Sequence, residues 1–170
     1  MSETYSFDEQ VKGQQEYFNQ FIEWLKKRKS IIEVNIASKE DDKKGTDLFV
    51  KTENGDIFTV QVKVDHKADN TGNIVFETIS QAYTNKNSVI GAEFAMAGVD
   101  YIFFVFSKSG RILGYKFTSL LEFVIENYKT FDNFQADNFG YKTLGVKVPV
   151  SSIKHLITHK GNLKEQLAGG

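Results

Sequence analysis

The stretch GTDLFVKTENGDIFTVQVKV, residues 45–64, decides the fold. Two apolar-rich runs, 47–51 and 57–64, flank the pair Asn54-Gly55, which is a strong signal for a tight β-hairpin turn. In the second run the side chains alternate, so that the valines lie on one face of the strand while Gln61 and Lys63 share the other. The stretch therefore predicts a β-hairpin whose second strand carries a polar pair inside a valine-rich run.

The length of the hairpin loop decides which residues share a face, because directly opposed residues of an antiparallel pair lie on the same side of the sheet. A two-residue loop pairs Asp47 with Val62 and separates Asp47 from Gln61 and Lys63. A three-residue loop, 53–55 with Gly55 left-handed, pairs Asp47 with Gln61 instead. We predict the three-residue loop or an equivalent bulge if these polar residues form one site, and Asp47 and Lys63 on opposite faces would exclude that site.

Apolar periodicity on either side of the hairpin predicts an α/β chain. Before the hairpin we expect an amphipathic helix over 7–29 that ends in a basic cluster, a strand over 31–37 and an exposed loop over 38–45. After it we expect a polar loop over 65–72, a strand over 73–79 that carries Glu77, and an irregular segment or short helix over 87–97. Strands over 101–107 and 111–117, joined by Ser109-Gly110, are expected to complete the sheet.

The remainder of the chain carries weaker signals. Thr118 is the expected N-cap of a helix that runs through Lys129. Ser151-Ser152 is the expected start of another helix through His159, and the tail from Gly161 is expected to fray. His155 and His159 are four residues apart, as zinc ligands on a helix are, but they lack a Glu-flanked pattern or a third ligand and are interpreted as surface residues.

Composition limits the class of protein. The chain has 170 residues, of which 41% are hydrophobic, and this length suits one domain with a substantial core. It contains no cysteine, which excludes disulfides and thiolate zinc sites, and its start lacks the pattern of a signal peptide, so we expect a cytoplasmic protein. The formal charge of −1 gives no overall attraction to nucleic acid but leaves room for a local basic rim.

The polar residues of the hairpin suit a divalent cation that is held against a phosphate. A carboxylate such as Asp47 binds Mg²⁺, and the Gln61 amide oxygen and the Val62 carbonyl can add oxygen ligands. Lys63, on the same face as Gln61, can stabilise developing phosphate charge or orient an attacking water. The alternative is an ordinary surface ion pair between Asp47 and Lys63, which contributes little to stability.

Gly45-Thr46-Asp47 followed by Gln61-Val62-Lys63 resembles the PD-(D/E)XK nuclease superfamily, in the variant with Gln at the second position that Mrr-like nucleases show. Over residues 11–117 the order of elements also resembles archaeal Holliday-junction resolvases. A second patch, which includes 71–77 and 99–102, resembles small phage- and plasmid-borne nuclease-like proteins.

The resemblance implies a restriction-endonuclease-like α/β core over about 7–130, with a central mixed sheet flanked by helices, a long N-terminal helix and a partly irregular segment 131–170 in the same domain. It also implies a Mg²⁺- or Mn²⁺-dependent endonuclease that acts on DNA, as a homodimer. In this reading Asp47, Gln61, the Val62 carbonyl and Glu77 hold the metal, and Lys63 acts at the phosphate.

Two departures from the superfamily pattern leave other functions open. The acidic ligand that the superfamily takes from its first helix aligns with Gln15, which is interpreted as a ligand or as a residue at the edge of the site. Glu77 is interpreted as a ligand or as a solvated strand position. With amides at Gln15 and Gln61, the chain could instead bind nucleic acid or a protein partner without cutting, or serve as an inhibitor or accessory protein through its surface alone.

Overall fold

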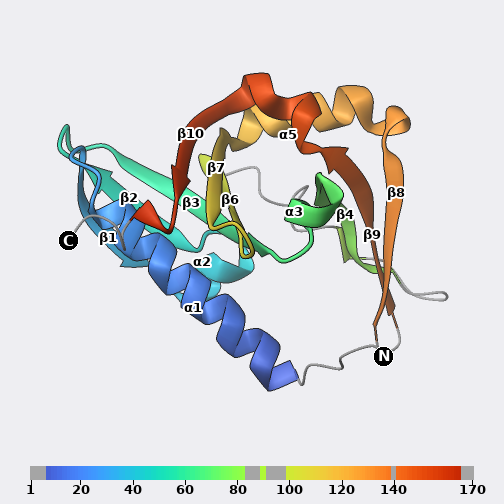
Figure 1. The fold of residues 1–170 in the computed structure, drawn as a ribbon, viewed down its shortest axis with the longest axis horizontal. Coiled ribbons are helices and arrows are strands. Elements are labelled where there is room, and N and C mark those ends of the chain that lie inside the picture. The colour runs from blue at the N-terminus through green and yellow to red at the C-terminus, as the bar shows by residue number, and fades with distance from the viewer. Residues whose placement is uncertain (1–6, 83–88, 91–98, 139–140, 166–170) are drawn as a thin grey trace.

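The structure, a computed structural model, describes residues 7–82, 89–90, 99–138 and 141–165. In chain order its elements are α1 (Phe7–Lys26), β1 (Ile31–Ile36), α2 (Lys39–Lys43), β2 (Leu48–Thr52), β3 (Ile57–Asp65), α3 (Ala68–Thr71), β4 (Asn73–Ala82), β5 (Val89–Ile90), β6 (Tyr101–Phe106), β7 (Arg111–Lys116), α5 (Phe117–Asn127), η1 (Tyr128–Thr130), β8 (Asp132–Asn138), β9 (Tyr141–Pro149), η2 (Val150–Leu156) and β10 (Ile157–Asn162) (Figure 1). The predicted segment 87–97 lies outside the described residues except for β5.

A six-stranded mixed sheet forms the centre, in the order β1-β2-β3-β6-β7-β10. Strands β3 and β6 are parallel, and every other neighbouring pair is antiparallel. The mixed α/β class, the mixed sheet and the long N-terminal helix predicted from the sequence are confirmed.

The β2–β3 hairpin has the register that the sequence predicted for a shared polar face. Leu48 pairs with Val60 and Lys51 with Ile57, and the backbone N–H of Thr52 donates to the Asp56 carbonyl at 2.9 Å. Three residues, 53–55, form the loop, and Gly55 takes φ +87°, a left-handed conformation that suits glycine. The same register brings Asp47 opposite Gln61, so the three-residue loop is confirmed.

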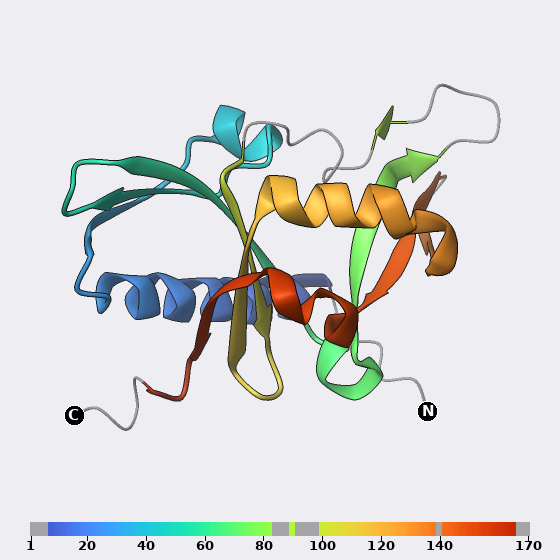
Figure 2. The ribbon, with the colours of Figure 1, turned by 90° about the horizontal axis from the view of Figure 1, so that it is seen from above.

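Helix α1 packs across one face of the central sheet (Figures 1 and 2). Its apolar stripe is buried against β2, β3 and β6 and consists of Phe21, Ile22, Trp24 and Leu25. Residues 102–106 of β6 are all buried, because alternate side chains face α1 on one side and a second core on the other. This packing holds the middle turns of α1, with Gln14, Gln15 and Phe18, near the carboxyl-terminal half of β3.

A second sheet, in the order β5-β4-β9-β8, covers the other face together with α5 (Figure 2). Its buried residues Ile74, Phe76, Val146 and Val148 share one core with β6, β7 and α5. Within the segment 131–170, which the sequence predicts to be partly irregular, the described residues form β8, β9, η2 and β10. The strand pair β8–β9 was missed because β8, with sequence DNFQADN, is almost entirely polar.

Other local predictions were wrong for tertiary reasons. Helix α5 begins at Phe117 without a side-chain N-cap, because the Phe117 N–H donates to the Asp100 carbonyl at 3.0 Å and its ring is fully buried. The expected helix 151–159 is a 3₁₀ segment that ends at Leu156, after which β10 adds to the sheet beside β7. Gly161 fits against Trp24, where a Cβ would lie 2.3 Å from the ring, so the chain is not frayed there.

The expected loops 38–45 and 65–72 each contain a short helix, α2 and α3. In the described part of the chain, no helix combines the length and hydrophobicity needed to span a bilayer.

Candidate active site

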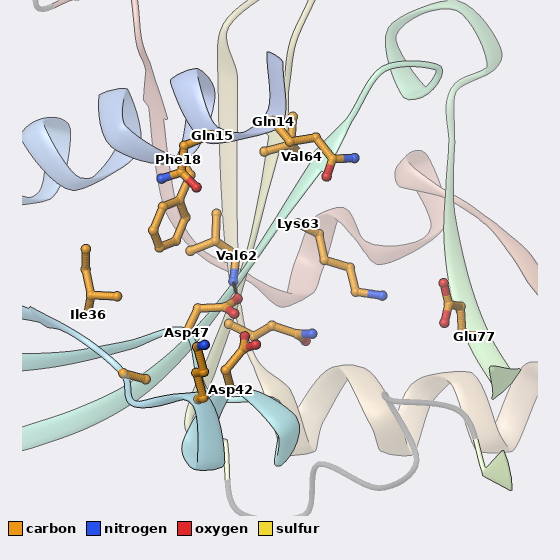
Figure 3. A pocket seen from close by; sticks show the side chains of 13 residues that line it. Gln14, Gln15, Phe18, Ile36, Asp42, Asp47, Val62, Lys63, Val64 and Glu77 are labelled. Carbon is orange, nitrogen blue, oxygen red and sulfur yellow. Dashed lines mark hydrogen bonds between the residues drawn. The ribbon is translucent and has the colours of Figure 1, made fainter. Parts of the chain in front are cut away.

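A cavity of about 670 Å³ opens where the start of β2, the carboxyl-terminal half of β3 and the middle turns of α1 meet the second sheet (Figure 3). It contains all six residues that the sequence suggested for a site, namely Gln15, Asp47, Gln61, Val62, Lys63 and Glu77. Its remaining lining residues are Gln14, Phe18, Ile36, Ala37, Lys39, Asp42 and Val64. The cavity thus combines side chains from both sheets and from α1 and α2.

Asp47 is fixed at the entrance to β2 by the hairpin. Its backbone N–H donates to the Val60 carbonyl at 2.9 Å, and its Oδ2 accepts the backbone N–H of Val62 at 2.7 Å. Gly45, at φ +94°, lets the chain turn from α2 into the strand. The carboxylate is therefore held beside the Val62 peptide, on the face that Gln61 and Lys63 share.

Asp42 belongs to the stretch 38–45, which the sequence predicts to be an exposed loop, and in the structure it lies beside Asp47 (Figure 3). It comes from α2, and its carboxyl lies within hydrogen-bonding reach of the Asp47 carboxyl (Figure 3). Burial raises the pKa of Asp47 to about 7; the Val62 N–H opposes this rise, and the adjacent Asp42 adds to it. A cation bound by both carboxyl groups would favour the charged form of Asp47.

The available signal for α2 was the pair Ser38 and Asp41, three residues apart, which is a helix-capping pattern. In the structure the Ser38 Oγ accepts the Asp41 N–H at 3.2 Å and donates to the Asp41 carboxylate at 2.9 Å. Recognition of that cap would have placed Asp42 on a helix directly before the hairpin.

Gln61 is 9% exposed, and its Oε1 has no hydrogen-bond partner among the residues that the structure describes. An acceptor buried in this way usually requires a partner, because leaving it unsatisfied costs about 1–3 kcal/mol. Gln15 lies on the α1 side of the cavity and is exposed, and its amide donates to Asn19 at 3.0 Å. The two amides thus differ, since Gln61 is buried with a free acceptor and Gln15 is solvated.

Lys63 extends from β3 toward the second sheet, and its ammonium points to the Glu77 carboxylate on β4 (Figure 3). Burial lowers the pKa of Lys63, and the negative charges of Glu77, Asp47 and Asp65 oppose that shift. Glu77 lies on β4 of the second sheet, which does not pair with β3, because the neighbours of β3 are β2 and β6. Glu77 reaches the cavity from across the gap between the sheets.

The oxygen atoms around Asp47 suit a hard cation. They comprise the two carboxylates of Asp42 and Asp47, the Gln61 amide oxygen and the backbone of Val62, and oxygen donors of this kind are what Mg²⁺ and Mn²⁺ prefer. Among the described residues, no three Asp, Glu or His side chains are grouped as a metal-binding cluster. His155 and His159 are exposed and belong to different elements, η2 and β10, so they do not form a helical pair.

Comparisons of the chain with protein-family models, with curated proteins and with solved structures found no match.

Proposed function

We propose that the chain is a metal-dependent DNA endonuclease built on a restriction-endonuclease-like core, and that the cavity between the sheets is its active site. The observation that supports this most is the hairpin register, which places Asp47 opposite Gln61 and puts Lys63 on the same face. A carboxylate and an amide oxygen that can hold a metal ion, together with an ammonium group that can stabilise phosphate charge, are groups that a metal-dependent phosphodiesterase can use.

The residues present fit a Mg²⁺ or Mn²⁺ ion. Asp47 would hold it together with the Gln61 Oε1, which lacks a partner among the described residues, and the Val62 carbonyl. When bound, the ion supplies charge that polarises a phosphate oxygen and lowers the pKa of a coordinated water. The Val62 N–H keeps Asp47 oriented by its 2.7 Å hydrogen bond to Oδ2.

Besides the metal ion, Lys63 would supply positive charge to the phosphate. Its ammonium lies in a cavity that is partly shielded from solvent, where an electrostatic interaction with a phosphate is stronger than in bulk water. Glu77 favours the charged form of Lys63 and orients it toward the second sheet. Glu77 is thus assigned a positioning role for Lys63.

Cleavage of supercoiled, linear, single-stranded and branched DNA with Mg²⁺ or Mn²⁺ tests the proposal. Wild type should cut with metal and stop with EDTA, while Lys63→Ala should lose about 100-fold or more of the rate. Lys51→Ala is the matched control, because Lys51 lies on the adjacent strand β2 but outside the cavity, and it should cut as wild type does. Metal-dependent cutting that Lys63→Ala leaves intact would refute the assigned site.

A second function, binding of nucleic acid without cutting, is favoured by Gln15 and by the lack of a three-carboxylate cluster in the described part of the chain. Few charged ligands give weak Mg²⁺ affinity and hence slow chemistry. A non-cutting binder should show DNA affinity that falls with salt in proportion to the phosphates contacted. A protein that binds only another protein, including a second copy of itself, should show neither cutting nor salt-dependent DNA binding.

A further inference from the structure

Helix α2 brings a second carboxylate to the cavity, in a position that the hairpin motif does not include. We propose that Asp42 is a direct ligand of the same divalent cation as Asp47. Helix α2 would then supply an anionic ligand, whereas α1 presents only the uncharged amide of Gln15 at the cavity. This inference rests on the proposed function, because it concerns the cation of that site.

The backbone fixes Asp42 relative to Asp47. At the start of α2 the Asp42 N–H donates to the Ser38 carbonyl at 2.9 Å. At its end the Gly45 N–H donates to the Asp42 carbonyl at 2.9 Å, and the Thr46 N–H donates to the Asp41 carbonyl at 3.0 Å. These bonds join α2 directly to the first residues of the hairpin, so the Asp42 carboxyl is held beside Asp47 by the local fold.

The charges around the pair leave room for a cation. Lys63 directs its ammonium toward Glu77, on the side of the cavity away from Asp42 (Figure 3). Lys39 also lines the cavity, but it is exposed, and a strongly hydrated ammonium on a flexible stem is a weak counter-ion. A divalent ion bound by both carboxylates would compensate their repulsion more fully, because it carries two charges.

Gln61 provides an independent indication of a ligand at the same place. Its side chain is more than nine-tenths buried and lines the cavity with Asp42 and Asp47, and its Oε1 accepts no hydrogen bond from the described residues. Two carboxylates and an amide acceptor without a donor form an oxygen-rich set, which matches the ligand preference of Mg²⁺ and Mn²⁺. The set does not match an anion, which would need donors.

Titration of the metal-free chain with Mn²⁺, followed by calorimetry or by the electron paramagnetic resonance of free Mn²⁺, tests this assignment. Asp42→Asn and Asp47→Asn should each weaken Mn²⁺ binding by about 10-fold or more, because each removes an anionic ligand. Glu40→Gln is the matched control, since it makes the same chemical change on α2 at an exposed residue outside the cavity, and it should bind as wild type does.

Thermal unfolding separates a ligand from a structural residue. In EDTA, Asp42→Asn should melt at or above the wild-type temperature, because it relieves repulsion, and its increase in Tm with Mn²⁺ should be smaller than that of wild type. Unchanged Mn²⁺ affinity in Asp42→Asn would overturn the inference and leave the nuclease proposal intact. Absence of Mn²⁺ binding by wild type would also overturn the inference. Mn²⁺ binding that depends on Asp42, in a chain that does not cleave DNA, would support Asp42 as a metal ligand and count against the nuclease proposal.

Discussion

At the scale of single residues, the carboxyl group of Asp47 is subject to opposing influences. Burial and the adjacent Asp42 favour its protonated form, while the Val62 N–H and Lys63 favour the charged form, and the result is a pKa of about 7. A carboxylate kept in this state is poorly compensated without a cation, which is typical of functional sites rather than of structural ion pairs.

The raised pKa of Asp47 predicts an unusual dependence of stability on pH. Because the folded-state pKa lies above the ordinary value of 3.8, the folded chain binds this proton more tightly than the unfolded chain does. The contribution of Asp47 to stability is thus greatest at low pH, decreases as pH rises from about 4 to about 7, and is constant above that.

Asp47→Asn should remove this decrease and stabilise the metal-free chain by about 1–3 kcal/mol at pH 8. Urea unfolding in EDTA between pH 5 and pH 8 measures it, and Asp56→Asn, a change at an exposed residue of the hairpin, serves as the control. A difference between Asp47→Asn and wild type that does not vary with pH would contradict the prediction.

The burial of Lys63 leads us to expect that replacing it removes activity without lowering the stability of the fold. Its ammonium is costly to bury, as the lowered pKa indicates, and Glu77 is half-buried, so water can solvate it if Lys63 is removed. Lys63→Met keeps most of the side-chain volume and should leave stability within about 1 kcal/mol of wild type, or raise it, while DNA cleavage is lost. Chemical denaturation and cleavage assays of the same preparation measure both, and a loss of more than about 3 kcal/mol would instead mark Lys63 as a structural residue.

These residues also show what the sequence could reveal about the site. Gln61 and Lys63 could be placed on one face from strand alternation alone, whereas placing Asp47 with them required a three-residue loop, which the pair Asn54-Gly55 allows but does not by itself select over a two-residue loop. Asp42 could not be placed in the same way, because its distance from Asp47 depends on a five-residue helix inside a stretch of charges. Such a stretch reads as a solvated loop unless its cap is recognised.

At the scale of elements, local rules succeeded where apolar periodicity is strong and failed where pairing is non-local. Helix α1, the β2–β3 hairpin and the β6–β7 pair were predicted within a few residues. Strand β9 contains the alternation Val146-Lys147-Val148, with both valines buried, but its partners are β4 and the polar strand β8. Strand β10 was missed because its sequence, ITHKGN, carries little β-propensity and is stabilised by pairing with β7.

The junction of β4 and β9 gives a prediction at this scale. Gly145 pairs with Glu77, and a Cβ at that position would lie 2.4 Å from the Phe76 carbonyl oxygen and 3.1 Å from the Glu77 Cα. Because the obstacle is backbone, Gly145→Ala should push β4 away at Glu77 and destabilise the chain by about 1–3 kcal/mol.

The control for this change is Gly13→Ala on α1, where a Cβ would meet no atom within 4 Å. This substitution should stabilise the helix by about 0.5–1 kcal/mol, because alanine has a higher helix propensity than glycine. Thermal unfolding distinguishes the two substitutions. If Gly145→Ala melts at the wild-type temperature, β4 and β9 are not packed as closely as the register indicates.

At the scale of the whole molecule, the middle strands β6 and β7 of the central sheet are buried on both faces, and the candidate site lies at the junction of the two covers. Phe103 and Val105 of β6 pack toward α1, while Ile102 and Phe104 pack toward the second sheet. The cavity receives Gln15 from the first cover and Glu77 from the second. Its shape therefore depends on the packing of both covers against the central sheet.

Residues 131–138 and 141–165 are consequently part of the fold that supports the site, whereas the sequence predicts a partly irregular segment there within the same domain. They bury Val146, Val148, Ile153 and Leu163, and each buried aliphatic side chain contributes about 1.5–3 kcal/mol. The sum, about 6–12 kcal/mol, is comparable with the whole stability of a typical domain. They also provide the pairing partners of β4 and of the outer edge of β7.

A chain that ends at Thr130 should therefore fail to fold, even though it contains Asp42, Asp47, Gln61, Lys63 and Glu77. Without β9, β4 loses its principal partner, and the apolar residues of β6 and β7 that face the second sheet become exposed. The fragment should show no cooperative thermal transition, should bind a hydrophobic dye, and should not bind Mn²⁺ with the affinity of the full chain. A fragment that melts cooperatively and retains Mn²⁺ affinity would show instead that α1 and the central sheet suffice for the site, and that the second sheet is an independent addition.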